Sequence, residues 1–151
     1  MKKIKGLLLF IAGIILLPTI VFAQPTTELS GVTYAKPGDT VAYDIKITSP
    51  DEEKATKYEA ELSYDKDILE LKSITAKSWT GKNTTDNLSF TYKDGTVGTS
   101  TIATITFKIK DNVPKQTTIV SLKNIKVTTL DENDSKNLVA ISENASHKVS
   151  L

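Results

Sequence analysis

The sequence contains no cysteine and no arginine, and it has only one histidine and one tryptophan. Without cysteine the chain can form neither a disulfide nor a thiol-linked lipid anchor, so its stability must come from buried apolar surface. Without arginine it lacks the planar side chain that binds phosphate or carboxylate groups in a bidentate manner. The formal net charge is only +1, which provides no basic excess for nucleic acid.

The single histidine, His147, limits the catalytic chemistry that the chain can perform. A Ser-His-Asp or Cys-His arrangement needs a histidine beside a buried nucleophile, whereas we interpret His147 as a surface residue near a sheet edge. Glu59 and Glu61 are two carboxylates of the kind that glycosidases use. Both lie on the polar side of an amphipathic strand, where no obvious feature raises the pKa of one carboxyl group above that of the other. The sequence therefore predicts a protein that is not an enzyme.

Residues 1–23 have the pattern of a secretory signal peptide. Three lysines precede an apolar run, and Ala23 precedes the polar Gln24. The alternative is a membrane anchor, but the apolar stretch of 17 residues is at the lower limit for a span and is interrupted by Pro18. We predict cleavage after Ala23 and a secreted domain over residues 24–151 that has no membrane association. Its formal charge is −2 instead of +1, because three lysines leave with the signal.

Alternation of apolar and polar residues predicts strands along most of the remaining chain. Side chains two residues apart on a strand share a face, so Tyr58, Ala60 and Leu62 predict a buried side opposite a charged one. No segment of 24–151 shows convincing helical periodicity. Seven or more short strands with frequent turns predict an all-β, antiparallel β-sandwich. The clearest alternations cover residues 41–47, 57–64, 88–92 and 103–109.

Three further stretches carry specific expectations. In 119–130 the apolar parity shifts between Leu122 and Ile125, which predicts a bulge. Asp94-Gly95 predicts a tight turn. Residues 76–87 are the least regular part of the chain, and we expect no more than one short strand there.

The aromatic residues suggest a second class of function, carbohydrate binding. Exposed aromatic faces can stack on sugar rings. Tyr34, Tyr43 and Tyr92 fall on the apolar parity of their strands and are assigned to the core. Trp79 lies among polar residues, so it is the only aromatic residue that we consider for sugar contact, although capping one end of the sandwich is the commoner role for such a residue.

Asp131, Asn133 and Asp134 lie in an oxygen-rich segment that superficially resembles a calcium loop. The helical calcium loop also requires glycine at its sixth position and glutamate at its twelfth. Those positions hold Lys136 and Ser142. We favour a plain turn between strands, with calcium binding as the alternative, and we predict no other cofactor.

Three motifs, in order, resemble those of cohesin domains, the modules through which bacterial scaffold proteins hold dockerin-bearing enzymes. Residues 30–32 and 36–41 are similar to the family's opening strand and its P-G-D-x-V turn. Residues 62–71 match its L-x-Y-D-x-x-x-L-E centre, and residues 102–109 match its A-T-I-T-F-K-V strand. The resemblance covers most of the chain after the signal.

This resemblance implies a jelly-roll sandwich of about nine strands and a role in binding a dockerin-like domain. Partners of cohesins dock on the outer face of the sheet that contains the strand ending in Y-D, which here carries Lys57, Glu59 and Glu61. The implied setting is outside the cell or on the surface of a bacterium, in connection with polysaccharide degradation. A carbohydrate-binding module and a structural fragment of a larger surface protein are the alternatives.

Overall fold

The computed structural model of the protein describes residues 23–50, 52–84, 86–131 and 137–151, with only the backbone of Lys82 and Asp131. All regular structure in these residues is β-strand, as predicted, and none of them forms a helix long and apolar enough to cross a membrane. The predicted signal peptide, residues 1–23, lies outside the described residues except for Ala23. The strands are β1 (Thr26–Gly31), β2 (Thr40–Ser49), β3 (Glu53–Ser63), β4 (Leu69–Ala76), β5 (Thr80–Asn83), β6 (Asn87–Thr96), β7 (Gly98–Ile109), β8 (Thr117–Asp131), β9 (Asn137–Ile141) and β10 (Ala145–Ser150).

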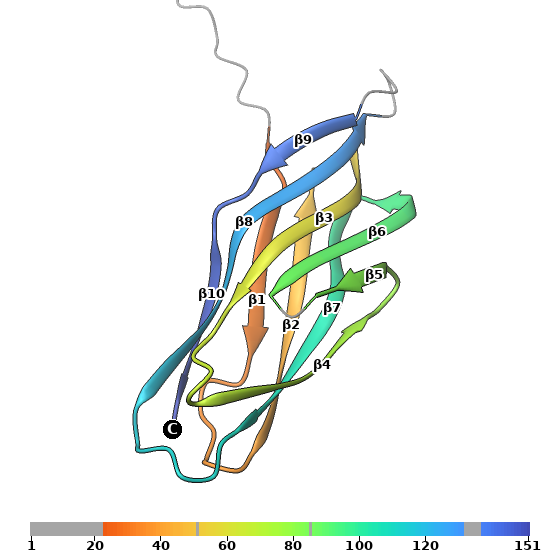
Figure 1. Cartoon of the computed structure of the whole chain (residues 1–151). Helices are drawn as coiled ribbons and strands as arrows, with labels where there is room; N and C mark the ends of the chain where they lie inside the picture. Colours follow the sequence, from red (N-terminus) through yellow and green to blue (C-terminus); the bar gives the residue numbers. More distant parts are fainter. Residues whose placement is uncertain (1–22, 51, 85, 132–136) are drawn as a thin grey trace, which may run out of the picture.

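Two antiparallel sheets pack face to face (Figure 1). One sheet has four strands in the order β1-β2-β7-β4. The other has the order β10-β8-β3-β6-β5, and β9 pairs with β8 beside β10. The predicted antiparallel jelly-roll sandwich is confirmed, with ten described strands where about nine were expected.

The core lies between the sheets and consists of the apolar sides of the described strands other than β5 and β9. Tyr43 of β2, Tyr58 of β3, Phe90 of β6 and Phe107 of β7 are fully buried. The rings of Tyr43 and Phe107 meet edge to face, with centroids 6.0 Å apart. Full burial of such a side chain stabilises the fold by about 1.5–3 kcal/mol. The alternation read from the sequence therefore describes the inward face of both sheets.

The corner at Asp65 carries the chain from one sheet to the other. The Asp65 side chain accepts a hydrogen bond from the backbone N–H of Asp67 at 2.9 Å, and the Asp65 carbonyl accepts one from Leu69 at 2.9 Å. These bonds close a tight polar turn. As a result β3 and β4 lie in opposite sheets, and both bury their apolar sides in the same core.

One turn prediction and one core assignment need correction. Asp94 and Gly95 form no hairpin turn: Gly95 adopts a φ of 66°, but both residues belong to β6, which continues to Thr96 and pairs with β3 again after a register shift. Tyr34, which we assigned to the core, is 64% exposed, because it follows the end of β1 and touches the sheet only through an isolated bridge to Ser150. The alternation of Val32 and Tyr34 thus does not belong to a buried strand.

Candidate partner-binding face

The outer face of β3 lies at the centre of the six-stranded sheet, between β8 and β6. Tyr58, Ala60 and Leu62 point into the core, so Lys57, Glu59 and Glu61 point outward. The ammonium of Lys57 and the carboxylate of Glu59 form an ion pair at 3.0 Å, and each side chain is 42% exposed. The three residues predicted for partner binding are therefore brought together on one face, which none of the described residues covers with a third layer (Figure 1).

The neighbouring strands add positive charge on one side and small polar groups on the other. On β8, Lys126 lies opposite Glu59 and Lys123 lies opposite Glu61. On β6 the partners of the same two glutamates are Ser89 and Asn87. Opposite charges on adjacent strands attract each other across a sheet. Sequence reasoning missed the β8 lysines, because the pairing of β3 with β8 joins segments that are far apart in the chain.

A bulge in β8 shapes this face. Asn124 adopts a φ of 51°, and the register between β3 and β8 shifts between Glu59 and Glu61. The extra residue lets Leu122 and Ile125 both point inward, which confirms the predicted break in parity. Asparagine tolerates this left-handed conformation better than other non-glycine residues do. The bulge places Lys123 and Asn124 side by side on the exposed surface.

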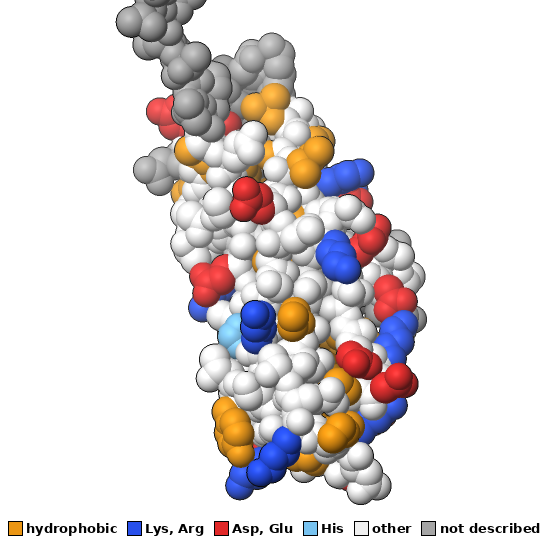
Figure 2. Space-filling model, turned by 90° about the vertical axis from the view of Figure 1, so that its left-hand side faces the viewer, with side chains coloured by type: hydrophobic (Ala, Val, Ile, Leu, Met, Phe, Trp, Pro, Cys, Tyr) orange, Lys and Arg blue, Asp and Glu red, His pale blue; other side chains and the backbone are white. Residues whose placement is uncertain are grey.

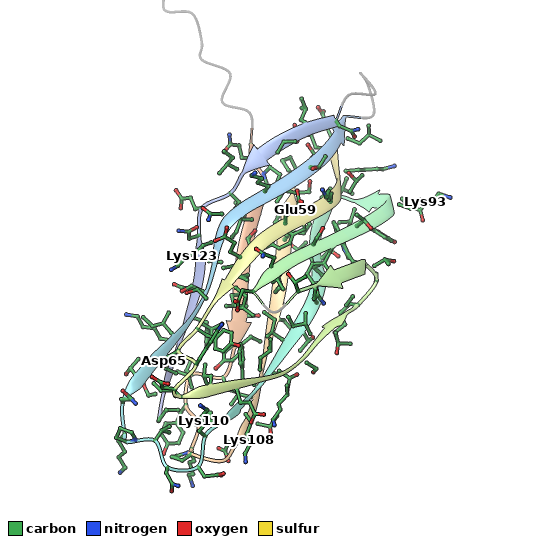
Figure 3. All side chains as sticks on the ribbon, viewed as in Figure 1. Glu59, Asp65, Lys93, Lys108, Lys110 and Lys123 are labelled. Carbon is green, nitrogen blue, oxygen red and sulfur yellow. The ribbon has the colours of Figure 1, made fainter. Side chains whose placement is uncertain are left out.

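Two shallow hollows meet on this surface. One, of about 520 Å³, is lined by Glu61, Tyr64 and Lys123, together with the ion pair between Lys66 and Asp86 at 3.2 Å. The other, of about 320 Å³, runs along β3 past Glu59 to Asn124 and Lys126, and both hollows share Glu61 and Asn87. Figure 3 shows Glu59 on β3 and Lys123 on β8 within this region. The face thus offers hydrogen-bond acceptors and ammonium groups to a macromolecular partner over an extended area.

The outer face of β3 lies directly above the buried core. Tyr58 lies between Lys57 and Glu59 in sequence, but its ring is fully buried in the core. Burial of this side chain raises the pKa of the Tyr58 hydroxyl well above its ordinary value, because the charged phenolate would lose its hydration. The strand that presents the charged residues is therefore held by an aromatic anchor.

Of the two roles considered for Trp79, the structure supports the structural one. Its side chain is only 3% exposed, and its ring packs against Tyr92 with the centroids 5.6 Å apart. The indole therefore belongs to the core and presents no open face to a sugar. The polar neighbours of Trp79 in the sequence left both roles open, and its burial results from the packing of the β4–β5 segment against β6.

The calcium alternative falls largely outside the described residues. Asn133 and Asp134 are not described, and only the backbone of Asp131 is. Elsewhere in the described part of the chain, no three acidic, histidine or cysteine side chains are grouped as metal ligands.

His147 is half-buried instead of fully at the surface: its ring lies 5.4 Å from that of Tyr43, and its Nε2 is 3.0 Å from the carbonyl oxygen of Val32.

Comparison with known proteins identifies the family. The family model described as "Cohesin domain" matches residues 25–146. A cohesin module of a family 33 glycoside hydrolase from Clostridium perfringens is 12% identical, with a TM-score of 0.68 over 85% of this chain and 97% of that one. The seventh ScaB type I cohesin from Pseudobacteroides cellulosolvens is 20% identical, with a TM-score of 0.64 over 83% and 92%. No curated protein sequence matches the chain significantly.

A third similar structure is a complex. The OlpA cohesin, solved with the dockerin Doc918 of Clostridium thermocellum as a type I cohesin–dockerin complex, is 15% identical. Its TM-score is 0.62, over 85% of this chain and 99% of that one. At these identities the solved structures establish the fold, and the family model establishes the relationship.

Proposed function

Because this chain belongs to the cohesin family, we propose that it is a non-catalytic module that binds a dockerin-type domain through the outer face of β8, β3 and β6. The observation that carries this proposal is the set of exposed charged residues on β3, flanked by the lysines of β8 and set in two adjoining hollows. Steering by complementary charge suits such a face. The cohesin–dockerin complexes among the similar structures support the same class of partner.

We place the carboxylates at the centre of the contact. Glu59 and Glu61 are outward on the central strand, and each has a lysine on one side and an amide or hydroxyl on the other. A partner that offers a basic or hydrogen-bonding group to either glutamate gains a charge-assisted hydrogen bond. The lysines of β8 limit the range of partners, because they repel a surface that is basic throughout.

The binding test uses residues 24–151 and the dockerin domains encoded in the same genome, measured by calorimetry. We expect a saturable one-to-one complex with at least one dockerin. The double variant Glu59→Lys, Glu61→Lys should weaken it by about tenfold or more, as expected for charge reversal at a central contact. The matched control is Glu70→Lys on β4, an exposed position in the opposite sheet. The proposal would be rejected if the double variant and the Glu70→Lys control bound the dockerin equally tightly, or if no dockerin bound the parent chain.

We further propose that the module acts outside a bacterial cell, in a polysaccharide-degrading or surface-attached assembly. The basic, apolar and small-residue pattern of residues 1–23 supports export. Intact-mass measurement of protein from the culture medium should find a chain that begins at Gln24. Recovery of the full-length chain only from the membrane fraction would contradict export with cleavage.

A further inference from the structure

Strand β9, Asn137–Ile141, is an edge strand with unusually apolar exposed side chains. It pairs with β8 alone, and no other described strand pairs with its second edge. Val139 is 64% exposed and Ile141 is 72% exposed, the largest value among the exposed large hydrophobic residues of the described chain. Figure 2 shows hydrophobic side chains near the upper end of the molecule, where β9 lies in Figure 1.

Val139 and Ile141 lie on the same face as the proposed binding residues. Val139 is opposite Thr128 of β8, which is opposite Lys57 of β3. Ile141 is opposite Lys126, which is opposite Glu59. Adjacent strands are about 4.8 Å apart, so these side chains lie about 10 Å from the centre of the face. The apolar pair thus directly continues the charged surface.

Three other outermost strands are protected in a way that β9 is not. Natural sheets discourage unwanted edge pairing by placing charged residues on their edge strands. Among the described strands, β1, β4 and β10 follow this rule, with Glu28, Glu70 and Lys148 respectively. The sequence of β9, Asn-Leu-Val-Ala-Ile, contains no charge and no proline. An exposed apolar strand without such protection is typical of a surface that a partner covers.

The size of the strand indicates which partner covers it. Five residues of strand extend about 17 Å, whereas a stable interface buries about 800 Å² on each side. The strand alone is therefore too small to hold a second copy of the chain. It suffices as the margin of a larger contact, and the larger contact next to it is the charged face of β3 and β8.

We propose that Val139 and Ile141 form an apolar margin of the dockerin-binding face and select partners that carry an apolar side chain beside the group that contacts Glu59. This inference rests on the proposed function and adds the chemistry of the partner to it. Contact with Val139 and Ile141 removes apolar surface from water, while the carboxylates fix the orientation. A partner that is polar at the corresponding position should bind less tightly.

The test measures the affinity of Val139→Asp and Ile141→Asp for the dockerin that binds the parent chain best. We expect each to weaken binding by about tenfold, a typical loss for an anchor residue. The matched control is Val32→Asp, since Val32 is also exposed, at 44%, but follows β1 in the other sheet. Ile141→Thr keeps a β-branched side chain, so a loss of affinity in this variant with an unchanged unfolding midpoint separates lost contact from lost strand structure.

The outcomes distinguish this inference from the function on which it rests. If charge reversal at Glu59 and Glu61 weakens binding and the β9 variants do not, the apolar margin is wrong and the proposed function stands. If neither set of variants weakens binding, or if no dockerin binds, both are wrong. An equal loss with Val32→Asp would also overturn the margin, as would a parent dimer in gel filtration that Ile141→Asp converts to a monomer.

Discussion

Lys57 and Glu59 form an ion pair at 3.0 Å on the outer face of β3, on either side of the buried Tyr58. Exposed pairs of this kind contribute about 0–1 kcal/mol to stability. The pair is thus of little value to the fold but well placed for recognition. This separation allows binding and folding to be tested independently.

We predict that Lys57→Ala lowers the free energy of unfolding by less than about 1 kcal/mol. The reason is that a half-exposed pair is screened by solvent and salt. Urea denaturation followed by tryptophan fluorescence measures the change, because Trp79 is buried in the folded chain. A loss of several kcal/mol would mean that the charged face is needed for folding and was not free to evolve for binding.

The bulge at Asn124 gives a second prediction. With its φ of 51°, a β-branched residue at this position is strained, whereas glycine is not. We expect Asn124→Val to destabilise the fold by about 1–2 kcal/mol and Asn124→Gly to be close to neutral. Chemical denaturation of both variants provides the comparison, and equal stability would show that the left-handed conformation imposes no constraint.

We predict that replacing Trp79 lowers the stability of the fold and that this residue takes no part in sugar binding. Trp79→Ala should cost about 3–5 kcal/mol, as for other buried aromatic residues. Trp79→Phe, the control, retains most of the buried apolar area and should cost clearly less. Thermal unfolding measures the first effect. Retention of the parent chain on insoluble polysaccharide, lost in a Trp79→Phe variant that remains folded, would contradict the assignment of this residue to the core.

Tyr58 predicts a dependence of stability on alkaline pH. Burial raises the pKa of its hydroxyl above the value of 10.0 for the unfolded chain. The folded state therefore keeps its proton where the unfolded state loses one, and stability falls as the pH rises above about 10. Tyr58→Phe has no proton to lose, so its stability should decline less steeply between pH 9 and pH 11, approximate bounds set by that pKa. Parallel slopes for the parent and the variant would refute this role.

How far the sequence predicts the structure depends on whether local pattern or distant pairing decides the outcome. The alternation around Tyr58 and Tyr43 predicts the inward faces correctly, because a strand with one buried side must carry an apolar residue at every second position. The parity shift before Ile125 predicts the bulge for the same reason. Local pattern fails at Tyr34, where the alternation continues beyond the end of β1.

Distant pairing accounts for what the sequence could not predict. The polar neighbours of Trp79 do not decide between sugar contact and a structural role, and its burial follows from contact with Tyr92 of β6. The lysines of β8 become part of the candidate site only because β8 pairs with β3. Likewise, residues 138–141 form a short apolar run in the sequence, but their position at the edge of the binding face depends on the register of β9 with β8.

The most direct test of the central claim is a map of the bound surface by nuclear magnetic resonance. Amide signals of isotope-labelled residues 24–151 are followed while an unlabelled dockerin is added. We predict that the shifted signals concentrate on β3, β6 and β8 around Glu59 and Glu61, while those of β2 and β7 stay in place. Shifts concentrated on β2 and β7 instead, with the β3 signals unchanged, would contradict it.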